Sequence, residues 1–232
     1  GTVNSQISGA FGAYAVNSGQ FINSSTVNAI PSGSVGIYAK NGTVENNGTI
    51  TSGYLGIYAE KDSTVTPSIT VVNHSGILRI NSGTGIYTKD EGTTTNLTGG
   101  SIGGTAASSA GVAAYDKAEI IVDGTNIELS GDQSTALILG NNTGNTEKSS
   151  LTLKSGSIGV GKEGTAVYST NGNIKIDSGY TGVITLGEKG TGIYADKDTV
   201  LDGTILNISY NHGTNKGAGI FYDGGTYTSN VS

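Results

Sequence analysis

The four residues Gly36-Ile37-Tyr38-Ala39 recur unchanged at residues 56–59 and 192–195. Six looser copies keep the order of a small, an apolar, an often aromatic and a mostly small residue, at residues 12–15, 85–88, 111–114, 136–139, 166–169 and 219–222. The third position advances by about 26 residues from one copy to the next on average. A unit of this length repeated along the whole chain predicts a solenoid, in which each repeat forms one coil.

A second motif lies between successive tetrads. It places apolar residues on both sides of a turn signal in which Asn, Asp or Ser precedes Gly, as in residues 44–50 (VENNGTI), 72–77 (VNHSGI) and 200–205 (VLDGTI). The short polar side chain bonds its own backbone and glycine accepts a positive φ, so the pair favours a turn. Apolar residues alternate at period two and no segment has a helical stripe. The pattern predicts an all-β solenoid of about nine coils, each with two or three strands.

The alternation also assigns the faces of the repeated strand. The second tetrad position is apolar in all nine copies and the fourth is mostly small, so both are predicted to face a narrow core. The third position then points outward and forms an aromatic ladder with a gap at Ala113 and Ile138. We expect two candidate ligand-binding patches, formed by Tyr38, Tyr58 and Tyr87 and by Tyr168, Tyr194 and Phe221. The alternative is that these rings only stabilise the stacking of the coils.

Two coils carry about seven extra residues at the same corner, within residues 60–70 and 140–150. Insertions in repeat proteins map to loops on one face, which is often the binding face. A groove between the two loops is therefore a second candidate site, with the polar side chains Lys61, Asp62, Asn141, Asn142 and Asn145 as ligand contacts. The alternative is neutral variation in length, because long surface loops cost little free energy.

The composition limits the possible partners. The 232 residues include 39 glycines, no cysteine and a net charge of −6, so the chain has no disulfide framework. Arg79 is the only arginine, and no basic cluster could neutralise a row of phosphates, which argues against nucleic acid. No apolar stretch approaches the ~18 residues of a membrane-spanning helix. The sequence has neither an initiator methionine nor a signal peptide, so we expect residues 1–232 to be a single β-helix segment of a longer chain.

The sequence offers little catalytic chemistry. Calcium-binding glycine-rich nonapeptides, phosphate loops and nucleophile elbows are absent. His74 and His212 are distant from each other and each sits in a predicted turn (NHSG and NHGT), which predicts polar corners. The acidic cluster of Asp196, Asp198 and Asp202 is interrupted by a lysine and lies in a predicted turn. We therefore predict no catalytic residue, no metal site and no cofactor, and we expect that the chain is not an enzyme.

The repeated Gly-Ile-Tyr-Ala units and the V-x-N-x-G-x-I turns resemble the passenger region of Gram-negative type V (autotransporter) proteins. The Thr-Gly-Ile-Tyr-Ala form at residues 191–195 is especially similar to the very large autotransporter adhesins of fusobacteria. The resemblance implies a right-handed parallel β-helix, displayed at the cell surface. It implies anchoring at the outer membrane only through a C-terminal β-barrel that this sequence does not contain.

The resemblance leads to a first expectation for function. The chain would be an adhesin segment that attaches to a protein or glycan on a host cell or on another bacterium. The alternatives are a structural spacer whose binding site lies elsewhere, a self-association module that uses ladders of Asn, Ser and Thr, and, less favoured, an enzyme that degrades polysaccharides.

Overall fold

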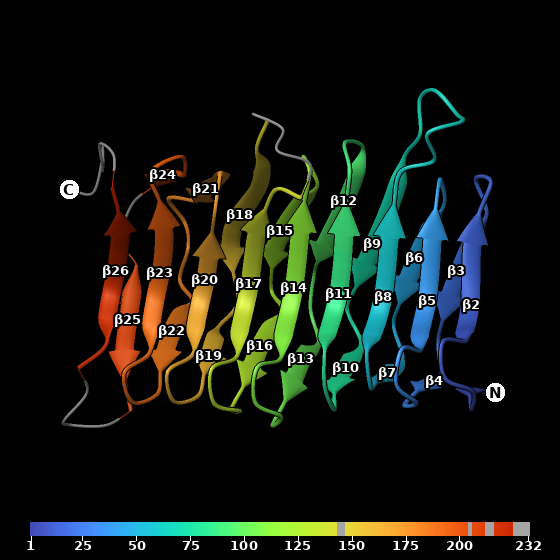
Figure 1. The fold of residues 1–232 in the computed structure, drawn as a ribbon, viewed down its shortest axis with the longest axis horizontal. Helices are drawn as coiled ribbons and strands as arrows, with labels where there is room; N and C mark the ends of the chain where they lie inside the picture. Colours follow the sequence, from blue (N-terminus) through green and yellow to red (C-terminus); the bar gives the residue numbers. More distant parts are fainter. Residues whose placement is uncertain (143–146, 204–205, 212–215, 225–232) are drawn as a thin grey trace.

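The computed structural model describes residues 1–142, 147–203, 206–211 and 216–224, and every regular element in them is a β-strand. Each turn of the chain contributes one strand to each of three parallel sheets, which we name sheets A, B and C (Figure 1). Sheets A and B have nine strands and sheet C has eight, so the described chain makes about eight complete turns. The predicted β-solenoid is confirmed, with three strands in each turn.

Sheet B contains the Gly-Ile-Tyr-Ala tetrads. Its strands, in spatial order, are β2 (Phe11–Val16), β5 (Val35–Lys40), β8 (Leu55–Glu60), β11 (Thr84–Lys89), β14 (Ala110–Tyr115), β17 (Thr135–Gly140), β20 (Thr165–Ser169), β23 (Thr191–Asp196) and β26 (Ala218–Asp223). Sheet C follows sheet B in each turn. It consists of β3 (Gln20–Asn23), β6 (Thr43–Asn46), β9 (Thr70–His74), β12 (Thr93–Leu97), β15 (Glu119–Asp123), β18 (Ser149–Ser155), β21 (Gly172–Ile176) and β24 (Val200–Gly203).

Sheet A completes each turn. It consists of β1 (Thr2–Ser5), β4 (Thr26–Ala29), β7 (Thr49–Ser52), β10 (Ile77–Ile80), β13 (Ser101–Gly104), β16 (Asn126–Leu129), β19 (Ile158–Val160), β22 (Val183–Leu186) and β25 (Asn207–Tyr210). In Figure 1 the chain runs up sheet B at the front and down at the back while it advances from the N-terminus at the right to the left. This path is a right-handed coil, as the resemblance implied.

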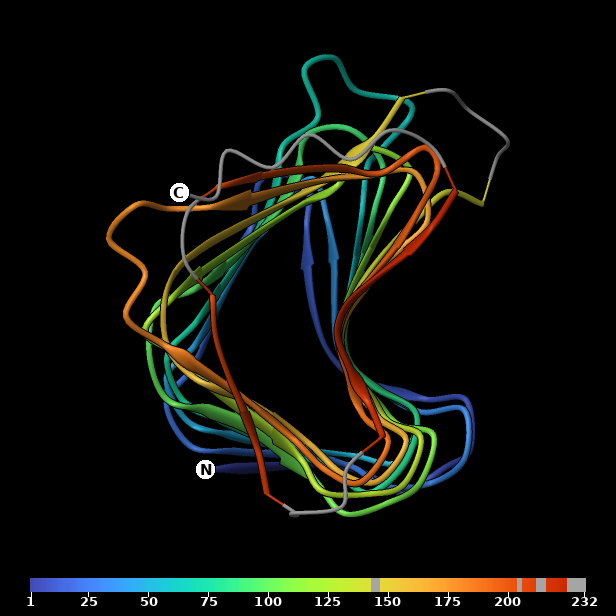
Figure 2. The same cartoon turned by 90° about the vertical axis from the view of Figure 1, so that its left-hand side faces the viewer.

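The core is a column of side chains from all three sheets. The second and fourth tetrad positions face inward, as predicted, and Ile37, Ala39, Ile57 and Ala59 are fully buried. Equivalent residues on neighbouring strands are paired in register, so the same type of side chain stacks on itself along the axis. Sheet B bends inward in the end-on view of Figure 2, which makes its outer face concave. No helix of the described residues is long and apolar enough to cross a bilayer.

One column of the core is polar. The Asn23 Nδ2 group donates to Asn46 Oδ1 at 2.7 Å, and Asn46 Nδ2 donates to His74 Nδ1 at 2.9 Å. His74 lies at the end of β9 and is completely buried. The expectation of a polar corner is therefore wrong for His74, because its side chain occupies an inward position that Leu97 fills on the next strand. His212 lies outside the described residues.

Candidate functional site

The outer face of sheet B carries the aromatic ladder that the tetrads predict. Tyr14, Tyr38, Tyr58 and Tyr87 are paired in register on consecutive strands, followed by Ala113 and Ile138 in the gap. The same column continues with Tyr168, Tyr194 and Phe221. The structure thus brings the predicted rings together as two separate groups on one face.

The N-terminal aromatic patch consists of Phe11, Tyr14, Tyr38, Tyr58, Tyr87 and Tyr115. Along the ladder, the ring centroids of Tyr38 and Tyr58 are 5.5 Å apart at 65°, and those of Tyr58 and Tyr87 are 5.6 Å apart at 69°. Edge-to-face pairs are favoured by the ring quadrupole and add to the burial of apolar area. In such a pair the edge of one ring meets the face of the other, so these rings cover less of one another's faces than a parallel stack does.

The C-terminal aromatic patch consists of Tyr168, Tyr194 and Phe221 and has a different geometry. Its rings are nearly parallel, with interplanar angles of 13° and centroid distances of 4.8 Å for Tyr168–Tyr194 and 5.5 Å for Tyr194–Phe221. Stacked rings cover one another's faces, and the middle ring is covered on both sides. Of the two patches, the N-terminal one is therefore better suited to stacking against a ligand.

Glu60 fixes two of the rings in the N-terminal patch. The Tyr38 hydroxyl donates to Glu60 Oε1 at 2.5 Å and the Tyr58 hydroxyl to Glu60 Oε2 at 2.6 Å. Lys89 Nζ lies 3.0 Å from Glu60 Oε2 and 6.0 Å from the centroid of the Tyr58 ring. The carboxylate thus holds two phenols and one ammonium group on three consecutive strands.

The same contacts shift the titration of these groups. Burial raises the pKa of Tyr58 to about 12, and the hydrogen bond to Glu60 adds to this effect. The pKa of Tyr38 is raised by the same two causes. Burial acts to raise the pKa of Glu60, but the hydrogen bonds from both tyrosines and the contact with Lys89 outweigh it, so this pKa is lowered. At neutral pH the network therefore contains a carboxylate, an ammonium group and two neutral phenols.

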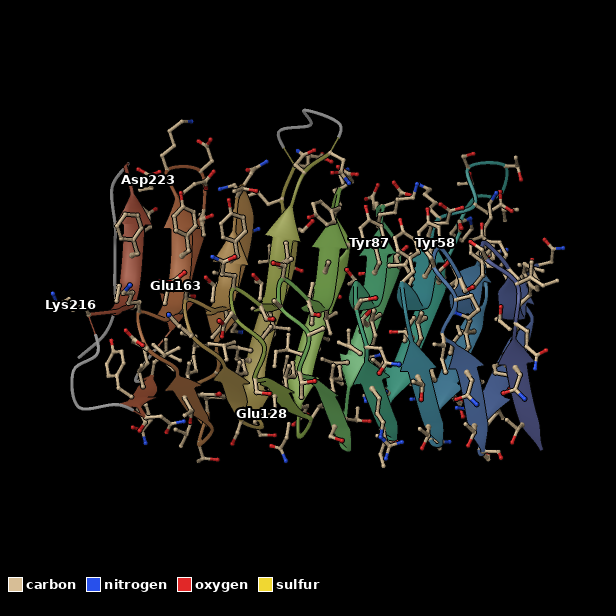
Figure 3. All side chains as sticks on the ribbon, turned by 60° about the horizontal axis from the view of Figure 1, so that its bottom comes forward. Tyr58, Tyr87, Glu128, Glu163, Lys216 and Asp223 are labelled. Atoms are coloured by element: carbon tan, nitrogen blue, oxygen red, sulfur yellow. The ribbon has the colours of Figure 1, made fainter. Side chains whose placement is uncertain are left out.

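A groove of about 540 Å³ lies at the start of the sheet B strands beside the N-terminal patch. Aromatic rings and a leucine form most of its side-chain surface, and two glycine corners border it; the lining residues are Phe11, Gly33, Val35, Tyr54, Leu55, Tyr58, Gly83, Thr84 and Tyr87. Tyr58 and Tyr87 lie side by side on this face, far from Asp223 at the other end of the molecule (Figure 3). A mostly apolar groove with fixed polar groups nearby is the usual form of a ligand site.

The first insertion forms a loop between β8 and β9, as predicted. Its Asp62 is buried, and it organises the loop itself. Asp62 Oδ1 accepts hydrogen bonds from the Thr64 amide and hydroxyl at 2.9 and 2.6 Å, and the Asp62 amide donates to Ser68 Oγ at 2.8 Å. The two hydrogen bonds from Thr64, together with the Lys40 ammonium, lower the pKa of Asp62. The structure thus gives Asp62 a structural role in the loop, whereas Lys61 is half-buried beside it.

The second insertion approaches the N-terminal patch. The Asn142 amide donates to Asp116 Oδ1 at 2.8 Å, and its Nδ2 group donates to the Tyr87 hydroxyl at 3.0 Å. Asn142 therefore reaches from the end of β17 to a ring two strands away, whereas Asn141 is half-buried at the base of the loop. Asn145 lies outside the described residues. The described groove is at the opposite end of the strands from both insertions.

Sequence reasoning missed three rings of the site, Phe11, Tyr54 and Tyr115. Tyr115 is paired with Lys89 and Gly140, two positions beyond the ladder column but on the same face. Its ring stacks on Tyr87 at 5.3 Å and occupies the space that the missing side chain of Gly140 leaves, so it covers part of the gap. Period-two parity applied to the whole strand would have identified Tyr115. Phe11 lies three residues before Tyr14 and so has the parity of an inward position, and Tyr54 lies on a corner where parity gives no signal.

Asp196, at the end of β23, organises the turn that follows it. Asp196 Oδ1 accepts hydrogen bonds from the Asn171 and Asp198 amides, both at 3.1 Å, and from the Thr199 hydroxyl at 2.9 Å. Within the described residues, no group of three or more His, Asp or Glu side chains could hold a metal ion.

A family model described as the BigA third pectate lyase-like domain matches residues 1–144. The chain belongs to this BigA domain family. No curated protein and no solved structure matches it. The BigA domain family and the β-solenoid both fit an autotransporter-type passenger. In the name of the BigA domain, "pectate lyase-like" describes the fold. The solenoid continues beyond the matched segment with the same three sheets.

Proposed function

We propose that the chain is an adhesive segment of a surface-displayed, autotransporter-type passenger protein. In this proposal the N-terminal aromatic patch and its groove bind a protein or glycan on a host cell or another bacterium. The observation that carries the proposal is the groove of about 540 Å³, which is lined by Tyr58 and Tyr87, two rings that meet edge to face rather than in a parallel stack. The BigA domain family and the solenoid fold support the passenger assignment.

The patch is organised before any ligand arrives. Glu60 holds the hydroxyls of Tyr38 and Tyr58, and Asn142 holds that of Tyr87, so binding would order few side chains. Each immobilised side chain otherwise costs about 0.5–1.5 kcal/mol of affinity. Tyrosine also offers both an apolar ring and a polar edge, which suits a sugar ring as well as the side chains of a protein.

The proposal is tested by removing one ring from each aromatic patch. We expect Tyr58→Ala to weaken attachment of the purified chain to host cells, bacterial cells or an arrayed glycan by about tenfold or more, since a hot-spot ring contributes over ~1.4 kcal/mol. Tyr194→Ala is the matched control, because it removes an equivalent ring from the C-terminal patch and should leave attachment unchanged. Equal attachment by all three proteins would refute the proposal and favour a spacer.

The proposed role involves binding without turnover. The side chains that a glycan would meet in the groove are mainly aromatic and aliphatic, and the nearby Glu60 is already paired with Lys89. We expect no release of sugar ends when the chain is incubated with acidic polysaccharides. Measurable turnover that Tyr58→Ala or Glu60→Gln abolishes would show instead that this face is catalytic. We also propose that the passenger is related to the fusobacterial adhesins and that it is anchored at the outer membrane.

A further inference from the structure

The outer face of sheet A is almost free of charge. In its nine strands only Arg79, on β10, and Glu128, on β16, are charged. The other outward positions are mostly Thr, Asn, Ser and Gly. The strands of sheet B, by contrast, contain five charged residues: Lys40, Glu60, Lys89, Asp196 and Asp223. Charge is one of the means by which proteins keep exposed β-structure from associating, and this face has little of it.

The two charges lie in one column with a glycine between them. Arg79 is paired with Gly103, and Gly103 with Glu128, so the two charged residues are two strand spacings, or about 10 Å, apart. Glu128 is exposed on this face (Figure 3), and its carboxylate lies over Gly159, on the side away from Arg79. No ion pair within the described residues involves either side chain.

We propose that sheet A is a self-association surface, on which a second copy of this chain packs face to face with its solenoid axis antiparallel. A two-fold axis in the interface and along β13 would bring Arg79 of each copy opposite Glu128 of the other. Gly103 would face Gly103 at the centre, where the lack of side chains allows a close approach. Such an interface is isologous, because the same patch is used by both copies. The surface is distinct from the concave face of sheet B, so the inference goes beyond the proposed adhesive site.

The charges select this arrangement over its alternatives. In a parallel pair, related by a two-fold axis along the solenoid, Arg79 would lie opposite Arg79 and Glu128 opposite Glu128, so like charges would face each other. An antiparallel pair displaced by one strand would put each charge opposite an uncharged neighbour of the column. Electrostatic complementarity of this kind mainly sets register and specificity. The Thr, Asn and Ser side chains around the charged residues can exchange hydrogen bonds in the selected register.

The test is a charge exchange followed by sedimentation equilibrium. The unmodified chain should dimerise reversibly. Arg79→Glu or Glu128→Arg alone should raise the dissociation constant at least tenfold, because either substitution creates two pairs of like charges that face each other across the interface. The double variant Arg79→Glu/Glu128→Arg should dimerise like the original. An equimolar mixture of the two single variants should also dimerise, because each then supplies the charge that the other lacks.

The matched control is Lys154→Glu, which makes the same change of charge as Arg79→Glu at an exposed position of sheet C. It should leave the dissociation constant unchanged. The proposal is overturned if the unmodified chain stays monomeric, if the control weakens association as much as Arg79→Glu does, or if neither the mixture nor the double variant recovers dimerisation. Circular dichroism of each variant verifies that the β-structure is retained.

Discussion

Gly56 approaches the next turn of the solenoid more closely than a side chain would permit. A Cβ atom at this position would lie 2.5 Å from the carbonyl oxygen of Gly85 and 3.2 Å from a methyl group of Leu78. Gly219 occupies the same place in β26, where no further strand follows in the described chain, and a Cβ there would meet only side-chain atoms at 3.5 Å or more. The same substitution, glycine to alanine, can therefore be compared at a crowded position and at an open one.

We predict that Gly56→Ala destabilises the chain by about 1–3 kcal/mol, which is typical of overpacking. This cost corresponds to a fall in Tm of about 2–4 °C per kcal/mol for a chain of this size. Gly219→Ala should change Tm by less than 1 °C. Thermal unfolding followed by circular dichroism measures both, and equal shifts would contradict the crowding argument.

At the scale of the element, the buried column Asn23–Asn46–His74 makes sheet C sensitive to acid. Because an amide Nδ2 group can only donate, His74 Nδ1 accepts from Asn46, and Nε2 carries the proton and faces the Ser101 carbonyl oxygen at 3.3 Å. Burial lowers the pKa of His74 from 6.5 to about 4. The folded chain therefore binds fewer protons than the unfolded chain between these two values.

The sign of the effect follows from linkage. Stability from the neutral histidine is fully present above pH 6.5, declines as the pH falls towards 4 and is lost below it. The total loss is on the order of 3 kcal/mol for a shift of this size. We predict that urea unfolding shows this decline in the original chain and that His74→Asn removes most of it. An unchanged pH profile in His74→Asn would contradict the assignment.

The same element shows what sequence can and cannot predict. Period-two alternation identified the inward tetrad positions, and it places His74 in the column of Leu97 and Val122, although the turn signal after it suggested a corner. The ring geometry of the aromatic patches was not predictable in this way. It depends on Glu60, which is 22 residues from Tyr38 and on the next strand, and on whether a carboxylate lies close enough to hold the phenols.

At the scale of the whole molecule, stability depends on contacts between neighbouring turns. Ile193 in β23 is fully buried, whereas its partner Ile220 in β26, with no further strand beside it in the described chain, is 41% exposed. A solenoid behaves as a linear array in which each repeat is stabilised by its neighbours, so end turns open more readily than central ones. The repeat, its length and its stacking were predictable from the sequence because every turn obeys the same pattern.

We predict a gradient of amide protection along the axis. Hydrogen exchange should be slowest in β11, β14 and β17, which have neighbours on both sides, and at least a hundredfold faster in β2 and β26 at the ends of sheet B. Mass spectrometry of peptides measures the gradient, preferably at low concentration where self-association is minimal.

Leu137→Ala, in the centre, should also speed exchange in β14 and β20 on either side, because it removes a fully buried side chain from their shared core. Uniform protection along the axis, or an effect of Leu137→Ala confined to β17, would mean that turns are stabilised independently of their neighbours.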